Sequence, residues 1–218
     1  MKKIIWPFSI FILILCSSCN LFSLVWTSPA SSKPGTVLYK DDFSKPSSGW
    51  ETFSDENSSL IAYQSNGLRI VVNQSQTDLW TRPGKKFADS WQEVDAIKLG
   101  GPDNNHFGLI CRYQDQNNFY AFLVSSDGYS GLVKMKGGKM TILGSGSLEY
   151  NQSIHQGQAL NRLRAGCIGP ILILLVNGEK ILARQDSDFG AGEIGLIAGS
   201  YEKPGVDIYF DNFVVYKP

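Results

Sequence analysis

The sequence is poor in the residues that most often carry catalysis and metal binding. It has only two histidines and four cysteines among 218 residues, and it contains no Gly-x-Ser-x-Gly motif. A serine hydrolase needs a positioned histidine, and zinc needs His and Cys at ligand spacing, so neither is expected here. We predict that His106 and His155 are ordinary surface residues.

The sequence also lacks an excess of positive or negative charge. The 20 basic residues balance the 20 acidic ones, and removal of Lys2 and Lys3 with a cleaved leader leaves 18 against 20, a net charge of −2. Such a chain has no basic excess that would attract a phosphate backbone, so nucleic acid is not an expected partner.

The first residues are typical of an export signal. Lys2 and Lys3 precede an apolar run from Ile4 to Leu15, and Cys16-Ser17-Ser18-Cys19 follows it. Small residues directly before a cysteine are typical of lipoprotein signals, in which that cysteine is acylated and becomes the new N-terminus. We predict a lipoprotein signal peptide over residues 1–18, a lipid on Cys19, and a domain that is extracytoplasmic and anchored to the membrane or cell surface.

Two other forms of export remain open. Lipoprotein signals usually have Leu or a similar aliphatic residue three positions before the cysteine, where this chain has Cys16. Apolar character resumes after the cysteine, so the segment from Ile4 to Trp26, about 23 residues, is long enough to be an uncleaved membrane span. Soluble secretion is the third form, although no Ala-x-Ala-like site is present.

The remaining chain divides into a linker and one folded domain. The stretch TSPASSKPG cannot bury enough apolar surface to fold, so we predict a lipid-anchored flexible linker over 19–35 and a single domain over 36–218. That domain consists of short apolar or alternating runs separated by Gly, Asn, Asp and Ser, with no convincing helical period. About 14 strands in two stacked sheets are expected, near residues 36–43, 58–63, 67–73, 77–82, 91–99, 105–113, 118–125, 129–136, 139–145, 160–168, 170–177, 180–185, 193–199 and 206–216.

Two cysteines remain in the folded domain, and an exported domain folds where thiols oxidise. Cys111 is in phase with apolar Phe107, Leu109 and Tyr113 on one strand, and Cys167 is in phase with apolar residues on another. We predict that Cys111 and Cys167 face one core and form a disulfide; two buried free thiols are the alternative.

The folded part contains, in this order, the segments GGPDNNHFGLICRYQDQNNFYAFLVSSDGYSGLVK, NRLRAGCIGPILILLVNGEKI, GEIGLIAG and VDIYFDNFVVY. They resemble the concanavalin A-like lectin/glucanase superfamily, and they look closest to its laminin-G-like and 3-keto-disaccharide-hydrolase-like domains. The resemblance covers about 37–216 and implies an all-β jelly-roll sandwich of two antiparallel sheets. It does not define an activity, since that superfamily includes lectins, glycan modules, hydrolases and structural spacers.

The resemblance suggests where to look for a hydrolase site. Glucanases on this fold usually carry Glu-x-Asp-x-x-Glu on one strand, and retaining hydrolysis needs two carboxyl groups about 5 Å apart. Here Glu93 and Asp95 match the first two positions, but Lys98 occupies the third. The same segment is equally explained as a strand with Val94 and Ala96 directed inward.

The resemblance also implies a structural calcium ion as the one candidate cofactor. Members of the superfamily hold a cation between their first and last strands, and this chain has Asp42 in the first strand region and Asp211 in the last. The alternative is that each aspartate caps a turn.

A glycan site needs aromatic platforms beside hydrogen-bonding side chains. Counting from an inward Cys111 places Arg112 on the opposite face, where Tyr120, Glu93 and Asp95 are expected to join it, and Trp80 would add a stacking surface. The alternative is that these long side chains only cover a sheet face.

Three functions remain open at this point. The first is a non-catalytic surface module that binds a glycan or another ligand, with Trp80, Glu93, Asp95, Arg112 and Tyr120 as its site. The second is a sugar-processing glycoside hydrolase, and the third is a structural or protein-interaction spacer of the cell envelope.

Overall fold

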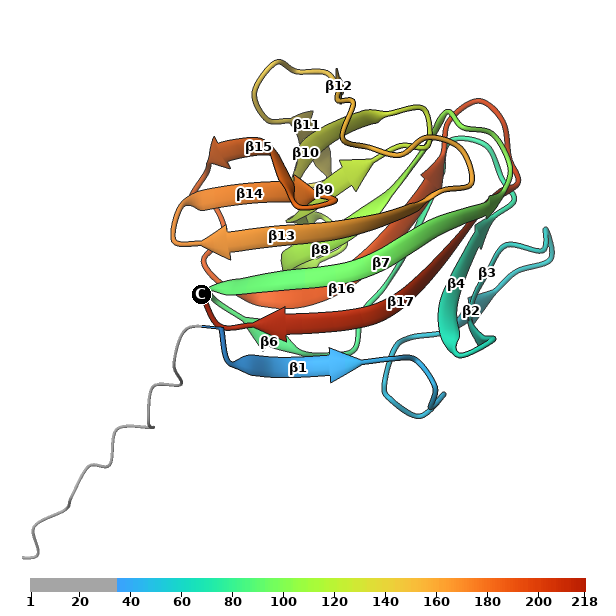
Figure 1. Ribbon diagram of the computed structural model, residues 1–218, viewed down its shortest axis with the longest axis horizontal. Coiled ribbons are helices and arrows are strands. Elements are labelled where there is room, and N and C mark those ends of the chain that lie inside the picture. Colours follow the sequence, from blue (N-terminus) through green and yellow to red (C-terminus); the bar gives the residue numbers. More distant parts are fainter. Residues whose placement is uncertain (1–34) are drawn as a thin grey trace, which may run out of the picture. The chain divides into compact units, whose positions relative to one another are not determined.

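The computed structural model describes residues 35–218 of the chain (Figure 1). The predicted signal peptide, the predicted lipidation site Cys19 and nearly all of the predicted linker lie outside the described residues. Ser32–Pro218 forms one compact unit. No helix within residues 35–218 has both the length and the apolar character needed to cross a membrane.

Sheet A has nine strands and lies toward the viewer in Figure 1. Strand β1 (Val37–Asp41) pairs antiparallel with β17, so the first and last strands are neighbours. The other strands follow the order β15 (Glu179–Gln185), β14 (Ile171–Val176), β13 (Leu160–Ile168), β7 (Ser90–Gly100), β17 (Val206–Tyr216), β4 (Gly67–Val72), β3 (Leu60–Gln64) and β2 (Phe53–Ser54).

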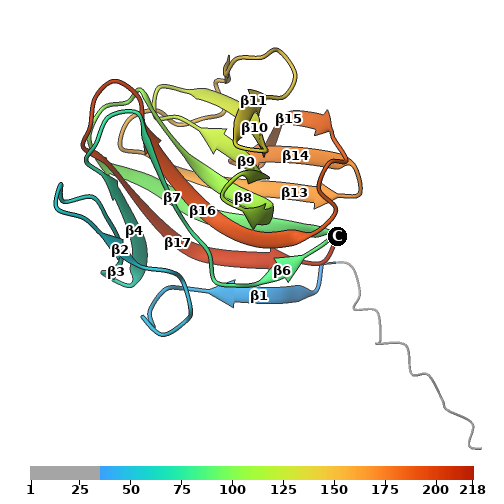
Figure 2. The ribbon, with the colours of Figure 1, turned by 180° about the vertical axis from the view of Figure 1, so that it is seen from behind.

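Sheet B has eight strands and is seen from its own side in Figure 2. Strand β12 (Glu149–Tyr150) pairs with β10, and β6 (Lys86–Phe87) pairs with β16. The remaining order is β11 (Lys139–Ile142), β10 (Tyr129–Lys136), β9 (Asn118–Val124), β8 (Asn105–Asp115), β16 (Gly192–Ser200) and β5 (Thr77–Thr81).

This architecture confirms the predicted fold class, an all-β jelly-roll-like sandwich of two antiparallel sheets. Every expected strand is present. The two-residue strands β2, β6 and β12 were not expected, because so short a segment leaves no alternation to detect.

The core lies between the sheets, and the predicted disulfide crosses it. Phe107, Leu109 and Cys111 of β8 point inward from sheet B, and Cys167 points inward from β13 of sheet A. The Cys111–Cys167 bond is present and joins the two sheets. Because both sheets, the core and this bond lie within residues 35–218, Ser32–Pro218 is expected to fold on its own.

The alternation along β8 breaks at Arg112. The partner residues of β16 show a bulge, since Gly195 pairs with Ile110 but Glu193 pairs with Tyr113. Arg112 has a φ of 52°, in the left-handed region. A bulge reverses the facing of the residues beyond it, so Tyr113 lies on the outer face of sheet B and not in the core as predicted.

Candidate functional site

The outer face of sheet B carries a second apolar cluster. Its members alternate with core residues along β8, β9, β10 and β16, which places them on the side of the sheet away from the core. Trp80 of β5 packs at the margin of the cluster, with its ring centroid 5.9 Å from that of Phe119. The cluster consists of Ile110, Tyr113, Phe119, Ala121, Leu123, Val133 and Ile197.

Part of this outer face is hollowed into an apolar cavity of about 250 Å³. Ala121, Leu123 and Ile197 of the cluster line it, and Met140 and Leu148 add apolar side chains from β11 and the segment after it. Gly131 leaves room for Leu148 in its observed position against the sheet, since a Cβ at residue 131 would lie 2.4 Å from Leu148 Cδ2. We call this space the apolar cavity.

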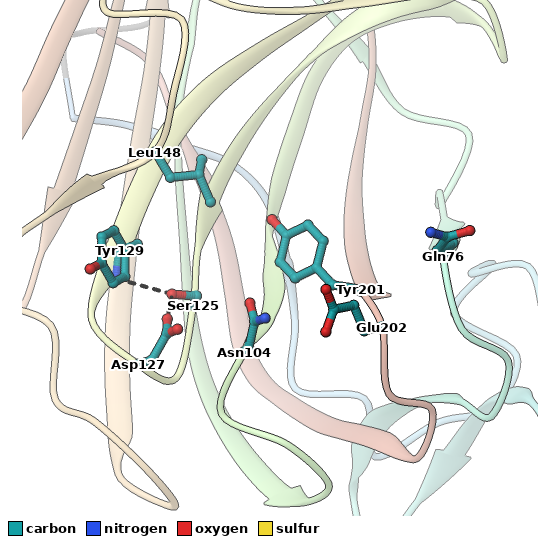
Figure 3. A pocket seen from close by; sticks show the side chains of 8 residues that line it. All are labelled: Gln76, Asn104, Ser125, Asp127, Tyr129, Leu148, Tyr201 and Glu202. Atoms are coloured by element: carbon teal, nitrogen blue, oxygen red, sulfur yellow. Dashed lines mark hydrogen bonds between the residues drawn. The ribbon is translucent and has the colours of Figure 1, made fainter.

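A larger hollow of about 650 Å³ adjoins the apolar cavity (Figure 3). Its lining comes from the turn between β9 and β10, the segment after β16, and the loops that precede β5 and β8. Gln76, Leu148 and Tyr201 line both spaces, so the two lie side by side. We call it the polar hollow; it is lined by Gln76, Asn104, Ser125, Asp127, Tyr129, Leu148, Tyr201 and Glu202.

The side chains of the polar hollow offer both hydrogen-bond donors and acceptors. Ser125 Oγ donates to the Asp127 carboxylate and accepts a bond of 3.0 Å from the backbone N–H of Tyr129. Burial, together with the negative charges of Asp78 and Asp127, raises the pKa of Tyr201 to about 12, so its hydroxyl keeps its proton. The hollow therefore presents carboxylate, amide and hydroxyl groups beside two tyrosine rings.

His106 lies at the edge of the apolar cavity, and it is not the surface residue that we predicted. Only 5% of it is exposed; its Nε2 lies 2.7 Å from Asp78 Oδ1, and its ring packs 4.9 Å from that of Tyr201. Glycine at position 199 leaves room for this pair, because a Cβ there would meet both side chains at 2.1 Å. His106 Nδ1 is buried without a hydrogen-bond partner among the described residues.

Two predicted site residues are buried, which corrects their expected place on an exposed face. Tyr120 is fully buried because it pairs with Cys111, and directly opposed residues share a face of a sheet. Its hydroxyl donates to the Asp186 carboxylate. Arg112 is 2% exposed at the bulge, where its guanidinium donates to the carbonyl oxygens of Ala88 and Phe189 and to Asp89.

Glu93 and Asp95 lie in the other sheet, on the outer side of β7. Arg162 of β13 donates two hydrogen bonds of 2.7 and 2.9 Å to Asp95, and Asn212 donates a third. Burial alone would raise the pKa of Asp95, but these bonds and the charge of Arg162 outweigh it and hold the pKa below its usual range. The predicted inward facing of Val94 and Ala96 is confirmed by their full burial.

The five predicted ligand residues are therefore not brought together. Glu93 and Asp95 are in sheet A, Arg112 and Tyr120 are buried in sheet B, and Trp80 alone lies on the outer face of sheet B. Lys98, at the third position of the glucanase-like segment, is paired with Asp103.

The two aspartates predicted to hold calcium approach one another at the β1–β17 edge. Burial raises the pKa of Asp211 above its usual range, and the negative charges of Asp95 and Asp42 add to the effect. No group of three or more His, Cys, Asp or Glu side chains within residues 35–218 is arranged to hold a metal ion. Calcium binding by Asp42 and Asp211 stays a prediction.

Most residues of the polar hollow were missed in the sequence. They come from five separate connections between strands, so no single stretch of the sequence contains them. A usable signal was present, because Asp127-Gly128-Tyr129 and Tyr201-Glu202 each place a tyrosine and an acid directly at the end of an expected strand. Without the strand order, nothing indicates that these two ends meet.

No family model matches the chain, and no curated protein matches it either. Among solved structures, it is similar to the carbohydrate-binding module CBM66 from Bacillus subtilis, with 18% identity and a TM-score of 0.62 over 78% of this chain and 96% of that one. A protein of unknown function with a galectin-like fold from the same species has 14% identity and a TM-score of 0.62 over 85% and 97% of the two chains.

A third similar structure is the GH43 protein BlXynB from Bacillus licheniformis, with 15% identity and a TM-score of 0.59. The match covers 82% of this chain but 39% of that one, so it involves only part of the enzyme. At these identities the likeness concerns the fold alone. The chain therefore shares a β-sandwich fold with these structures, one of which is described as galectin-like.

Proposed function

We propose that this domain is a non-catalytic carbohydrate-binding module and that the glycan binds in the polar hollow. The observation that carries the proposal is the composition of that hollow, in which two tyrosines stand beside two carboxylates, two amides and a hydroxyl. The volume of about 650 Å³ lies in the usual range of ligand pockets, about 300–1,000 Å³.

Sugars suit this mixture of groups. Their hydroxyls donate to carboxylates and exchange hydrogen bonds with amides, while their C–H faces pack on aromatic rings. Tyr129, which is 41% exposed, offers an accessible ring, and Asp127 and Glu202 offer acceptors on either side of the hollow (Figure 3). Solved proteins with the same fold include a carbohydrate-binding module, which adds support.

A glycoside hydrolase is the alternative that the same hollow keeps open. Asp127 and Glu202 both line it, and retaining hydrolysis uses a pair of carboxyl groups. The glucanase-like Glu93 and Asp95 do not supply such a pair, because Asp95 is held by Arg162 on the other sheet.

The test is a glycan-array screen with the oxidised fragment Ser32–Pro218, in the presence and absence of Ca²⁺, followed by product analysis on each hit. We expect binding without product, and weaker binding by Asp127→Asn and Glu202→Gln. Release of product would favour the hydrolase, whereas no binding across the array would favour a structural or protein-interaction spacer of the envelope.

We also propose that the domain is displayed outside the cytoplasm on a lipid attached to Cys19. The basic residues, the apolar run and the small residues before Cys19 support this, and the Cys111–Cys167 disulfide fits an oxidising compartment. Metabolic labelling with a fatty acid should mark the wild-type chain and not Cys19→Ala. Labelling of neither chain, with both in the membrane fraction, would favour an uncleaved span.

A further inference from the structure

The apolar cavity is the part of the site that a bare sugar would leave unused. It lies beside the polar hollow at Gln76, Leu148 and Tyr201, yet Ala121, Leu123 and Ile197 make its wall unsuitable for hydroxyl groups. A hydroxyl buried against such a wall would lose its hydrogen bonds to water without replacement. The two spaces together therefore suit a molecule that is polar at one end and apolar at the other.

We propose that the ligand is an amphiphilic glycoside, whose sugar occupies the polar hollow and whose aryl or short alkyl aglycone occupies the apolar cavity. This inference rests on the proposed carbohydrate-binding function and narrows its ligand class. A soluble aryl glycoside and the headgroup-proximal part of a glycolipid share this chemistry.

The size of the cavity fits an aglycone of that kind. An apolar cavity of about 150 Å³ is sufficient to hold a benzene ring. The cavity here measures about 250 Å³, which leaves room for one ring and a short substituent but not for a second sugar unit and its hydration. Met140, which is 57% exposed, stands at its edge, and a flexible thioether can adjust to ligands of different shape.

Within the described residues, His106 adds an unpaired polar atom to the lining of the apolar cavity. Its side chain lines the cavity and is more than nine-tenths buried, and its Nδ1 has no partner within the described part of the chain. An unpaired buried nitrogen costs free energy unless a ligand or a water satisfies it. When His106 is neutral and its Nε2–H donates to Asp78, Nδ1 is left, among the residues described, as an unpaired acceptor in the lining of the cavity.

The experiment compares matched pairs of methyl and 4-nitrophenyl glycosides of the common hexoses and pentoses, and 4-nitrophenol alone, by calorimetry on the oxidised fragment Ser32–Pro218. We expect the nitrophenyl glycoside of the preferred sugar to bind at least about tenfold more tightly than its methyl partner, because the ring leaves water. The nitrophenol alone should bind weakly.

Two variants locate the effect in the cavity. Ala121→Phe fills the space with the protein's own ring, and Met140→Glu places a charge at its edge with little risk to folding, since Met140 is largely exposed. Both should lower the affinity for the nitrophenyl glycoside to about that of the methyl glycoside, so that the preference is lost. Thr141→Glu, the next residue along β11 and also exposed, is the matched control and should keep the preference.

Each other outcome is decisive. Equal affinity for methyl and nitrophenyl glycosides would overturn the amphiphile inference and leave the carbohydrate-binding function standing. Binding of 4-nitrophenol as tightly as any glycoside, with sensitivity to Ala121→Phe, would mean that the sugar contributes nothing, which overturns both. No binding by any probe would also overturn both.

Discussion

The outer faces of the two sheets differ in what surrounds their polar side chains. On sheet A, charged side chains satisfy one another: Arg162 binds Asp95, and Arg69 binds Asp207.

On sheet B, an apolar cluster forms the floor of a hollow and the polar groups stand around it. Some of these groups are paired, as in Arg82–Glu193 and His106–Asp78. Each sheet has buried atoms without a hydrogen-bond partner among the described residues, such as His106 Nδ1 on sheet B and Arg164 Nε on sheet A.

This difference separates a polar face that stabilises the fold from one that can receive a ligand. A carboxylate that accepts two bonds from an arginine has little left to offer a sugar, however suitable its residue type. The candidate site therefore lies where polar groups border an apolar floor, and the density of charged residues is a poor guide to it.

The largest effect on stability is expected from removing the disulfide that joins the two sheets. Cys111–Cys167 closes a loop with a sequence separation of 56 residues, so replacing both cysteines by alanine should lower the free energy of unfolding by about 4 kcal/mol in the chain-entropy account. Urea denaturation of the oxidised wild type and the double variant measures this. Equal midpoints would show that core packing alone holds the sheets together.

Two substitutions, one on each sheet, test by glycan affinity which outer face binds the ligand. Tyr129→Ala, in the polar hollow, should weaken glycan binding about tenfold, because an exposed aromatic contact with the sugar is lost. Arg162→Ala, on sheet A, should leave the affinity unchanged. Calorimetry with the best glycan from the array gives both values, and the reverse pattern would move the site to sheet A.

Much of the fold was predictable because burial imposes a regular pattern. Alternating apolar residues located every strand longer than two residues, and the parity of Cys111 and Cys167 correctly predicted their pairing. Such signals are local, so a single strand is enough to reveal them.

The site was less predictable because it depends on features that are not local. Counting by twos placed Arg112 outward and Tyr113 inward, and one extra residue at the bulge reversed both. Tyr120 was misplaced because its facing follows from its pairing with Cys111, and the register of two strands cannot be read from either one. The polar hollow depends on strand order, which brings the β9–β10 turn to the segment after β16.

The pH dependence of the stability of Arg162→Ala tests whether the ion pair between Arg162 and Asp95 stabilises the fold. The pKa of Asp95 is lowered in the folded protein, so its contribution to stability is present above the unfolded pKa of about 3.9 and is lost as the pH falls through the folded value. Because Arg162 is half exposed, the variant should lose only about 1 kcal/mol at pH 7, and the difference from wild type should shrink toward pH 3.

Urea denaturation at the two pH values measures this, with Lys180→Ala, an exposed lysine on β15, as the control. A difference between Arg162→Ala and wild type that stays constant with pH would mean that the arginine acts through packing and not through the charge of Asp95.

The smallest expected effect concerns calcium at the β1–β17 edge of sheet A. Because the pKa of Asp211 is raised, this carboxylate opposes folding increasingly as the pH rises above its unfolded value, and Asp211→Asn should raise the Tm slightly at pH 7 without metal. A bound Ca²⁺ would offset the repulsion between Asp42 and Asp211, so a concentration near its Kd should raise the wild-type Tm by about 1–2 °C.

Thermal unfolding of the wild type and Asp211→Asn, each with Ca²⁺ and with EDTA, separates the two effects. The variant should lose the calcium response and keep its raised Tm in EDTA. If both proteins respond equally to Ca²⁺, the ion binds elsewhere, whereas no response in either would leave the two aspartates as turn caps. With no calcium response, Asp42 and Asp211 would join the other charged groups of sheet A as structural residues, and the candidate ligand site would lie on sheet B alone.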